Sequence, residues 1–168
     1  MKLSNSTIVF EKKLPGLNSR VLTEFLQKAR RAAGLHGTVS VLITGNSSMS
    51  RLNSRFRGKS AATDVLSFPA ATPANGFAGD IAISLDIAEH NARLLGHSLP
   101  EEIRILILHG VLHLAGYDHE NDQGEMAKKE IALRKLFALP SGLIERGSQA
   151  PRRKKSAKGP PLPARSRR

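Results

Sequence analysis

The sequence predicts an α+β fold, a small mixed β-sheet of about four strands packed with about five helices. Two observations support this. Stretches with strand-like and helix-like patterns follow one another without regular alternation, which argues against a repeated βα architecture. One helical stretch is apolar on nearly all sides, which places it in the middle of the domain. With 168 residues, 40% of them hydrophobic, the chain is long enough for one domain with a real core.

The first half of the chain supplies the predicted strands. We expect strands over residues 7–12, 38–44, 64–68 and 80–84, the second of which alternates β-branched residues (TVSVLIT). A loop rich in Ala, Pro and Gly, residues 69–79, separates the last two. A short helix is expected over 49–56 and an amphipathic one over 18–33. The apolar positions of the latter are Val21, Leu22, Phe25, Leu26, Ala29 and Ala33.

The second half is predicted to be helical. A helix over 85–95 ends at Gly96, and Ser98 with Glu101 forms a capping-box pattern that opens the next helix. This is the apolar, central helix, and Gly116 ends it. A last amphipathic helix over 123–137 should cover the core with these side chains: Met126, Ile131, Leu133, Leu136 and Phe137.

Charge divides the chain into two regions. The formal net charge is +12, and residues 147–168 hold eight Lys or Arg and no acid, among several prolines. We therefore expect a folded domain over 1–146 and a disordered basic tail over 147–168. Such a surplus predicts a polyanionic partner, and the tail lacks an apolar face for a membrane, so contact with nucleic acid is favoured.

Other bulk features narrow the class of protein. The absence of cysteine excludes disulfides, thiolate zinc sites and a cysteine nucleophile. No signal-peptide pattern and no apolar run long enough to cross a bilayer are found, so a cytoplasmic location is expected.

Three of the six histidines lie within eleven residues, in the string HGVLHLAGYDH. His109 and His113 are four residues apart on the central helix, which puts both imidazoles on one face. The bend at Gly116 can then return His119 towards the same point. Three imidazoles with one open position are typical of a catalytic zinc site. The spacing predicts a metal site at the end of the central helix.

The same spacing occurs in metalloproteases, but one residue argues against that activity. Such enzymes have Glu directly after the first histidine as general base, and this chain has Gly110. A phosphodiester substrate fits better, because its charge suits both a metal and a basic surface. Asp118, in the bend, is either a carboxylate that orients a ligand imidazole or a turn residue.

A basic loop offers a second element of phosphate chemistry. Arg55, Arg57 and Lys59 stand together in RFRGK, and Gly58 lets the backbone approach a ligand closely. Alone this is a weak signal. Beside a hydrolytic metal site it predicts the group that holds the scissile phosphate.

At these residues the sequence resembles the YbeY family of bacterial endoribonucleases, or rRNA maturation factors. The string HGVLHLAGYDH resembles the family signature HGxLHLxGYDH, and LN followed by FRGK and TDVLSFP resembles a second block. The resemblance covers about residues 5–140. Ser60, Ala62 and Ala115 depart from residues that are common in the family.

The resemblance implies one zinc ion per chain on His109, His113 and His119, with Arg57 as the catalytic arginine and Arg57 and Lys59 as RNA-binding residues. It also implies a single-strand-specific, metal-dependent endoribonuclease in small-subunit rRNA 3′-end maturation and ribosome quality control. Ribosomal RNA and the small ribosomal subunit would be its partners.

The residues leave several alternatives open. A second hypothesis is a ribosome assembly or RNA-binding factor whose metal only stabilises the fold. Three imidazoles also suit nickel, copper and iron. The general base can be water on the metal, Asp118 or the 2′-hydroxyl of the substrate. The sequence does not indicate an oligomeric state.

Overall fold

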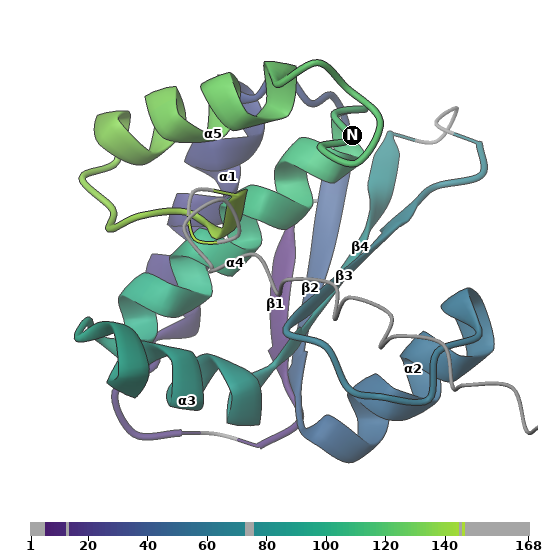
Figure 1. The fold of residues 1–168 in the computed structure, drawn as a ribbon, viewed down its shortest axis with the longest axis vertical. Coiled ribbons are helices and arrows are strands. Elements are labelled where there is room, and N and C mark those ends of the chain that lie inside the picture. Colours follow the sequence, from purple (N-terminus) through teal and green to yellow (C-terminus); the bar gives the residue numbers. More distant parts are fainter. Residues whose placement is uncertain (1–5, 13, 73–75, 145, 147–168) are drawn as a thin grey trace, which may run out of the picture.

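The computed structural model describes residues 6–12, 14–72, 76–144 and 146. Within these ranges the chain forms four strands and five helices (Figure 1). The predicted α+β class is confirmed. The tail expected over 147–168 lies outside the described residues. None of the described helices is both long and apolar enough to span a bilayer.

The sheet is mixed, as predicted, with strand order β1-β2-β4-β3. β1 (Thr7–Phe10), β2 (Thr38–Thr44) and β4 (Phe77–Ser84) run parallel. β3 (Val65–Pro69) pairs antiparallel with β4 and forms an edge of the sheet. This edge strand lies next to the site described below.

The helices divide unequally between the two faces of the sheet. Four of the described helices lie on one face, and α2 (Asn46–Arg57) lies on the other (Figure 1). The four are α1 (Ser19–Ala32), α3 (Leu85–Leu95), α4 (Leu99–Leu114) and α5 (Glu125–Leu136).

Helix α4 is the centre of the fold. Its side chains contact α1, α3, α5, β3 and β4, and eleven of its residues are buried. Ser98 and Glu101 form the predicted capping box: Ser98 Oγ accepts from the Glu101 N–H at 3.3 Å, and Glu101 Oε2 accepts from the Ser98 N–H at 2.8 Å. The first turn of the buried helix is therefore satisfied by its own cap.

The largest differences from the predicted boundaries are at the starts of two elements. α2 begins at Asn46 rather than 49, although Asn and Ser are weak helix formers. Its first turn is fixed by tertiary contacts, because the Asn46 N–H donates to Asp86 at 2.7 Å and its amide oxygen accepts from Ser84 Oγ. β4 begins at Phe77 rather than 80, because pairing with β2 extends the strand into the expected loop.

Two predicted core positions were also wrong. Val21 of α1 is 41% exposed and Leu136 of α5 is 67% exposed, because each lies at the margin of its helix's buried face. The other predicted members of these faces are buried or half-buried.

Candidate metal centre and substrate groove

The end of α4 brings the histidine string together through a glycine turn. Gly116 has a φ of +94°, which L side chains rarely adopt. This conformation lets the Tyr117 N–H donate back to the Leu112 carbonyl at 3.1 Å. The chain then reverses, and His119 returns to the face that His109 and His113 present.

The three imidazoles converge as the spacing predicted. One ring nitrogen of each lies within 4.8 Å of the others, so the group can hold a metal ion. The Nε2 atoms of His109 and His113 are 3.1 Å apart, close to the separation of about 3.3 Å that two nitrogens have on one tetrahedral zinc. His109 is buried, His113 half-buried and His119 exposed, so the cluster opens to solvent on one side.

Hydrogen bonds determine which nitrogens carry protons. His109 Nδ1 faces Glu130 Oε1 at 2.9 Å and His113 Nδ1 faces the Tyr117 carbonyl at 3.0 Å. The Tyr117 carbonyl can only accept, so His113 Nδ1 carries a proton, and a Glu130 carboxylate likewise accepts from His109 Nδ1. Burial, with the neighbouring imidazoles, lowers the pKa of His113 to about 4, so it is neutral at pH 7. At 3.1 Å the two Nε2 atoms can share either a proton or a metal ion.

Glu130 is a residue that the sequence analysis missed. It is 1% exposed, on α5, and its two oxygens accept from His109 Nδ1 and from the Ile144 N–H. A signal was present, because Glu130 lies four residues after Met126 and three before Leu133, both buried. A carboxylate at a core position of an amphipathic helix needs a buried partner.

Asp118 serves the turn rather than a ligand imidazole. Its oxygens accept from the Glu120 N–H at 3.1 Å and from the Asn121 side-chain amide at 2.5 Å. These bonds lower the pKa of its carboxyl group. Of the two readings left open for Asp118, the hydrogen bonds favour the turn residue.

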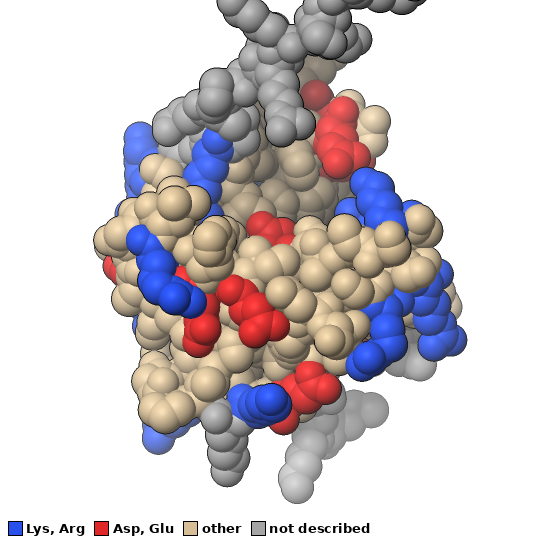
Figure 2. Space-filling view, turned by 60° about the horizontal axis from the view of Figure 1, so that its bottom comes forward, with Lys and Arg blue, Asp and Glu red and all other residues tan. Residues whose placement is uncertain are grey.

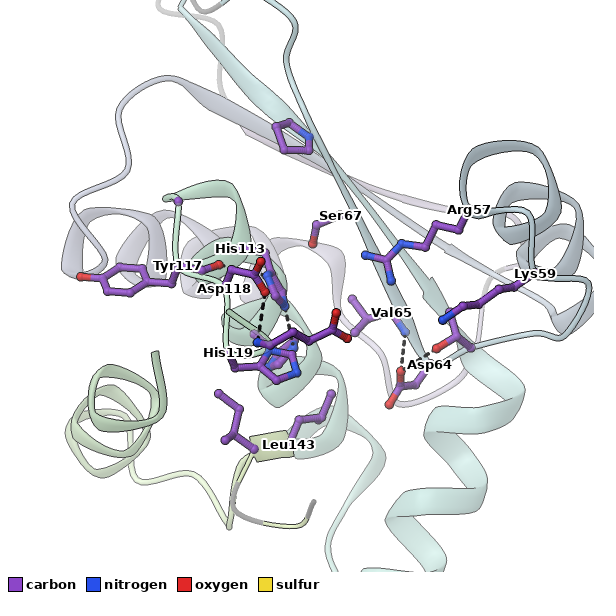
Figure 3. Close-up of a pocket in the computed structure, with 16 residues that line it drawn as sticks. Arg57, Lys59, Asp64, Val65, Ser67, His113, Tyr117, Asp118, His119 and Leu143 are labelled. Carbon is purple, nitrogen blue, oxygen red and sulfur yellow. Dashed lines mark hydrogen bonds between the residues drawn. The ribbon is translucent and has the colours of Figure 1, made fainter. Parts of the chain in front are cut away.

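A groove of about 1,080 Å³ opens in front of the histidines. Arg57 and Lys59 line it from the end of α2, opposite His113 and His119, and the Arg57 guanidinium points into it (Figure 3). The predicted basic residues and the histidines therefore share one space. Three acidic residues also line the groove: Asp64, Asp118 and Glu120.

Arg55, the third member of the basic loop, does not line the groove. Its guanidinium carbon lies 5.4 Å from the centre of the Phe56 ring. Helix α2 contains three arginines and no acid, and Figure 2 shows basic side chains gathered on the side of the molecule where α2 lies. This side adds positive potential near the groove.

Gly110 has a structural reason to be glycine. A β-carbon there would lie 2.9 Å from the Ile81 side chain of β4. The helix therefore packs directly on the sheet at the position where a metalloprotease has its general base. This agrees with the argument against peptide hydrolysis.

Fold and site together define a class: a small α+β protein with three converging imidazoles at the end of a buried helix, opening on a groove with a cationic wall. A family comparison is more specific. The sequence profile described as Endoribonuclease YbeY matches residues 2–137. The chain belongs to this family.

Individual relatives support the same family assignment. The chain is 57% identical over 151 residues to Endoribonuclease YbeY of Koribacter versatilis, which covers 90% of this chain and 97% of the relative. It is 44% identical over 141 residues to the protein of that name from Solibacter usitatus, covering 84% and 94%. The solution structure of TM1509 from Thermotoga maritima superposes with a TM-score of 0.54 at 26% identity, covering 90% of this chain and 99% of that one.

Proposed function

We propose that this chain is a zinc-dependent endoribonuclease. His109, His113 and His119 hold one zinc ion, and Arg57 with Lys59 holds the phosphodiester. The observation that supports the proposal is that ring nitrogens of all three histidines lie within 4.8 Å of one another in a groove that Arg57 also lines. The names of the relatives support nuclease activity, and do not favour a factor whose metal only stabilises the fold.

The donor set fits zinc. Among the described residues the cluster consists of three imidazoles, and a site with three protein ligands leaves a coordination position for a substrate or water. When bound, zinc supplies a Lewis acid and an activated water at neutral pH.

The protein's own side chains orient the ligand imidazoles and neutralise the charge of the phosphate. The bond from His109 to Glu130 and the bond from His113 to the Tyr117 carbonyl fix the two rings so that their Nε2 atoms face the metal position. Arg57 can bind two phosphate oxygens through parallel N–H···O hydrogen bonds and offset the negative charge that develops on them. Lys59 adds a second positive charge from the same side of the groove.

The substrate and setting follow from the family resemblance. We infer that the chain acts on single-stranded RNA in the 3′-end maturation of small-subunit rRNA and in ribosome quality control, with the small ribosomal subunit as partner and the cytoplasm as compartment. The basic surface over α2 and the basic composition of residues 147–168 support an RNA partner.

Two substitutions separate the proposed roles. His113→Ala should lose bound zinc and RNA cleavage together, because it removes one of three ligands. Arg57→Ala should keep zinc and lose most cleavage, by about 100-fold or more if the guanidinium stabilises the transition state. Arg20→Ala, an exposed arginine of α1 outside the groove, is the control. Full activity of metal-free protein would refute the proposal, and undiminished cleavage by Arg57→Ala would remove that residue from the site.

A further inference from the structure

The chain after α5 returns to the groove. Ala138 has a φ of +51°, and the Leu139 N–H donates to the Arg134 carbonyl at 2.9 Å, which ends the helix and turns the chain back. Leu139 is buried. We call residues 139–144 together with Arg146 the C-terminal segment. It lies beyond residue 137, where the match to the family profile ends.

Two buried carboxylates fix this segment. The Ile144 N–H donates to Glu130 Oε2 at 3.1 Å, and a β-carbon on Gly142 would lie 2.7 Å from the Glu130 carboxyl group. Arg146 forms two bonds of 2.9 Å with the fully buried Glu102 of α4. A bidentate ion pair with a buried partner is directional and costly to break. The segment is thus held in one position against α4 and α5.

The segment gives the groove an apolar side. Leu143 and Ile144 line the groove, are half-buried, and pack against the main core. Figure 3 places Leu143 near His119, across the groove from Arg57 and Lys59. The cationic side chains and the metal are sufficient to bind a phosphodiester group. An apolar surface in the same groove matches the other part of a nucleotide, its base, which apolar side chains hold when it leaves a stack.

We propose that Leu143 and Ile144 form a base-binding wall, which takes an unpaired nucleobase next to the scissile phosphate. The inference rests on the proposed nuclease function and deepens it. A base in a duplex is stacked and paired, so it reaches the wall only at the cost of unstacking. A base in a single strand reaches it freely. The wall therefore favours single-stranded RNA through an attractive contact.

The test is a thermodynamic cycle that combines removal of a base from the RNA with removal of an apolar side chain from the wall. Single-stranded pentaribonucleotides with nuclease-resistant backbone linkages, one intact and five with an abasic residue at each position in turn, are bound to the zinc-loaded full chain, and Kd is measured by fluorescence anisotropy. For the wild type, removal of one base should weaken binding about tenfold. For Leu143→Ser and Ile144→Ser, intact RNA should already bind about tenfold more weakly than it binds the wild type. Removal of the base that the wild type recognises should then weaken binding little further.

Three controls make the result specific. Leu136→Ser removes a leucine that is 67% exposed on α5 and lies outside the groove, and should bind like the wild type. Leu143→Met keeps an apolar side chain and should restore base discrimination. Zinc content should be unchanged in every variant.

Three outcomes would overturn the proposal. The first is equal base discrimination in wild type and Leu143→Ser. The second is that the wild type binds the intact strand and every abasic strand with equal affinity. The third is loss of zinc in parallel with loss of binding, which would show that the segment builds the metal site instead. Because Kd is measured without cleavage, failure of the wall and failure of the nuclease function are distinguishable.

Discussion

Glu130 joins three parts of the molecule at one carboxylate. It orients His109, holds the Ile144 backbone, and lies under Gly142. A buried carboxylate with both oxygens occupied fixes the imidazole's tautomer and its direction. The geometry of the histidine cluster therefore depends on a residue outside the cluster.

We predict that Glu130→Gln weakens zinc binding by about 10- to 100-fold. The amide has one acceptor oxygen in place of two, so either the His109 bond or the Ile144 bond is lost. The measurement is zinc affinity by competition with a chelator. Glu24→Gln, at an exposed ion pair of α1, is the control. Equal zinc affinity of Glu130→Gln and the wild type would remove Glu130 from the site.

At the scale of elements, α4 connects the fold to the site. One end begins at the Ser98 capping box and the other ends at Gly116, so the position of the histidines depends on a helix that is fixed at both ends. The apolar pattern and the cap were sufficient to predict this helix, because local spacing and local hydrogen bonds determine both.

Ser98→Ala should lower the free energy of unfolding by about 1 kcal/mol, because the Glu101 N–H loses its acceptor. Chemical denaturation measures it. A loss below a few tenths of a kcal/mol would show that the cap contributes little. Zinc content of the folded protein should not change.

The same cap predicts a pH effect. Bonds from Ser98 lower the pKa of Glu101 below its ordinary value of 4.5. A lowered folded-state pKa stabilises the fold above the unfolded pKa, and this stabilisation is lost as pH falls through the lowered value. Glu101→Gln should therefore have a smaller acid-dependent loss of stability than the wild type as pH falls below 4.5.

The element boundaries and side-chain pairings that could not be predicted depend on contacts between segments that are distant in the sequence. The start of α2 at Asn46 depends on Asp86 and Ser84, and the extension of β4 depends on β2. The convergence of the histidines was predictable, because all three lie within one helix and one turn. The pairing of His109 with Glu130 joins residues 21 apart on separate helices, and no local pattern contains that information.

At the scale of the whole molecule, charge is distributed unevenly. Of the net +12, residues 147–168 contribute +8, and Arg57 and Lys59 line the groove. The affinity of a basic protein for RNA falls as salt rises, with a slope that depends on the number of phosphates neutralised.

Removal of residues 147–168 should flatten the salt dependence of RNA binding, because up to eight positive charges are lost. The measurement is Kd for a single-stranded RNA across a series of salt concentrations. A full-length chain with these Lys and Arg residues changed to Gln separates charge from length. An unchanged slope would show that the tail is inert.

We propose that His109, His113 and His119 together bind one metal ion. The most direct measurement is the zinc content of the purified full chain, compared with that of His109→Ala, His113→Ala and His119→Ala. We predict one zinc per wild-type chain and a large loss in each variant that remains folded. A folded wild-type chain that binds no divalent metal, or variants that keep it undiminished, would contradict the account.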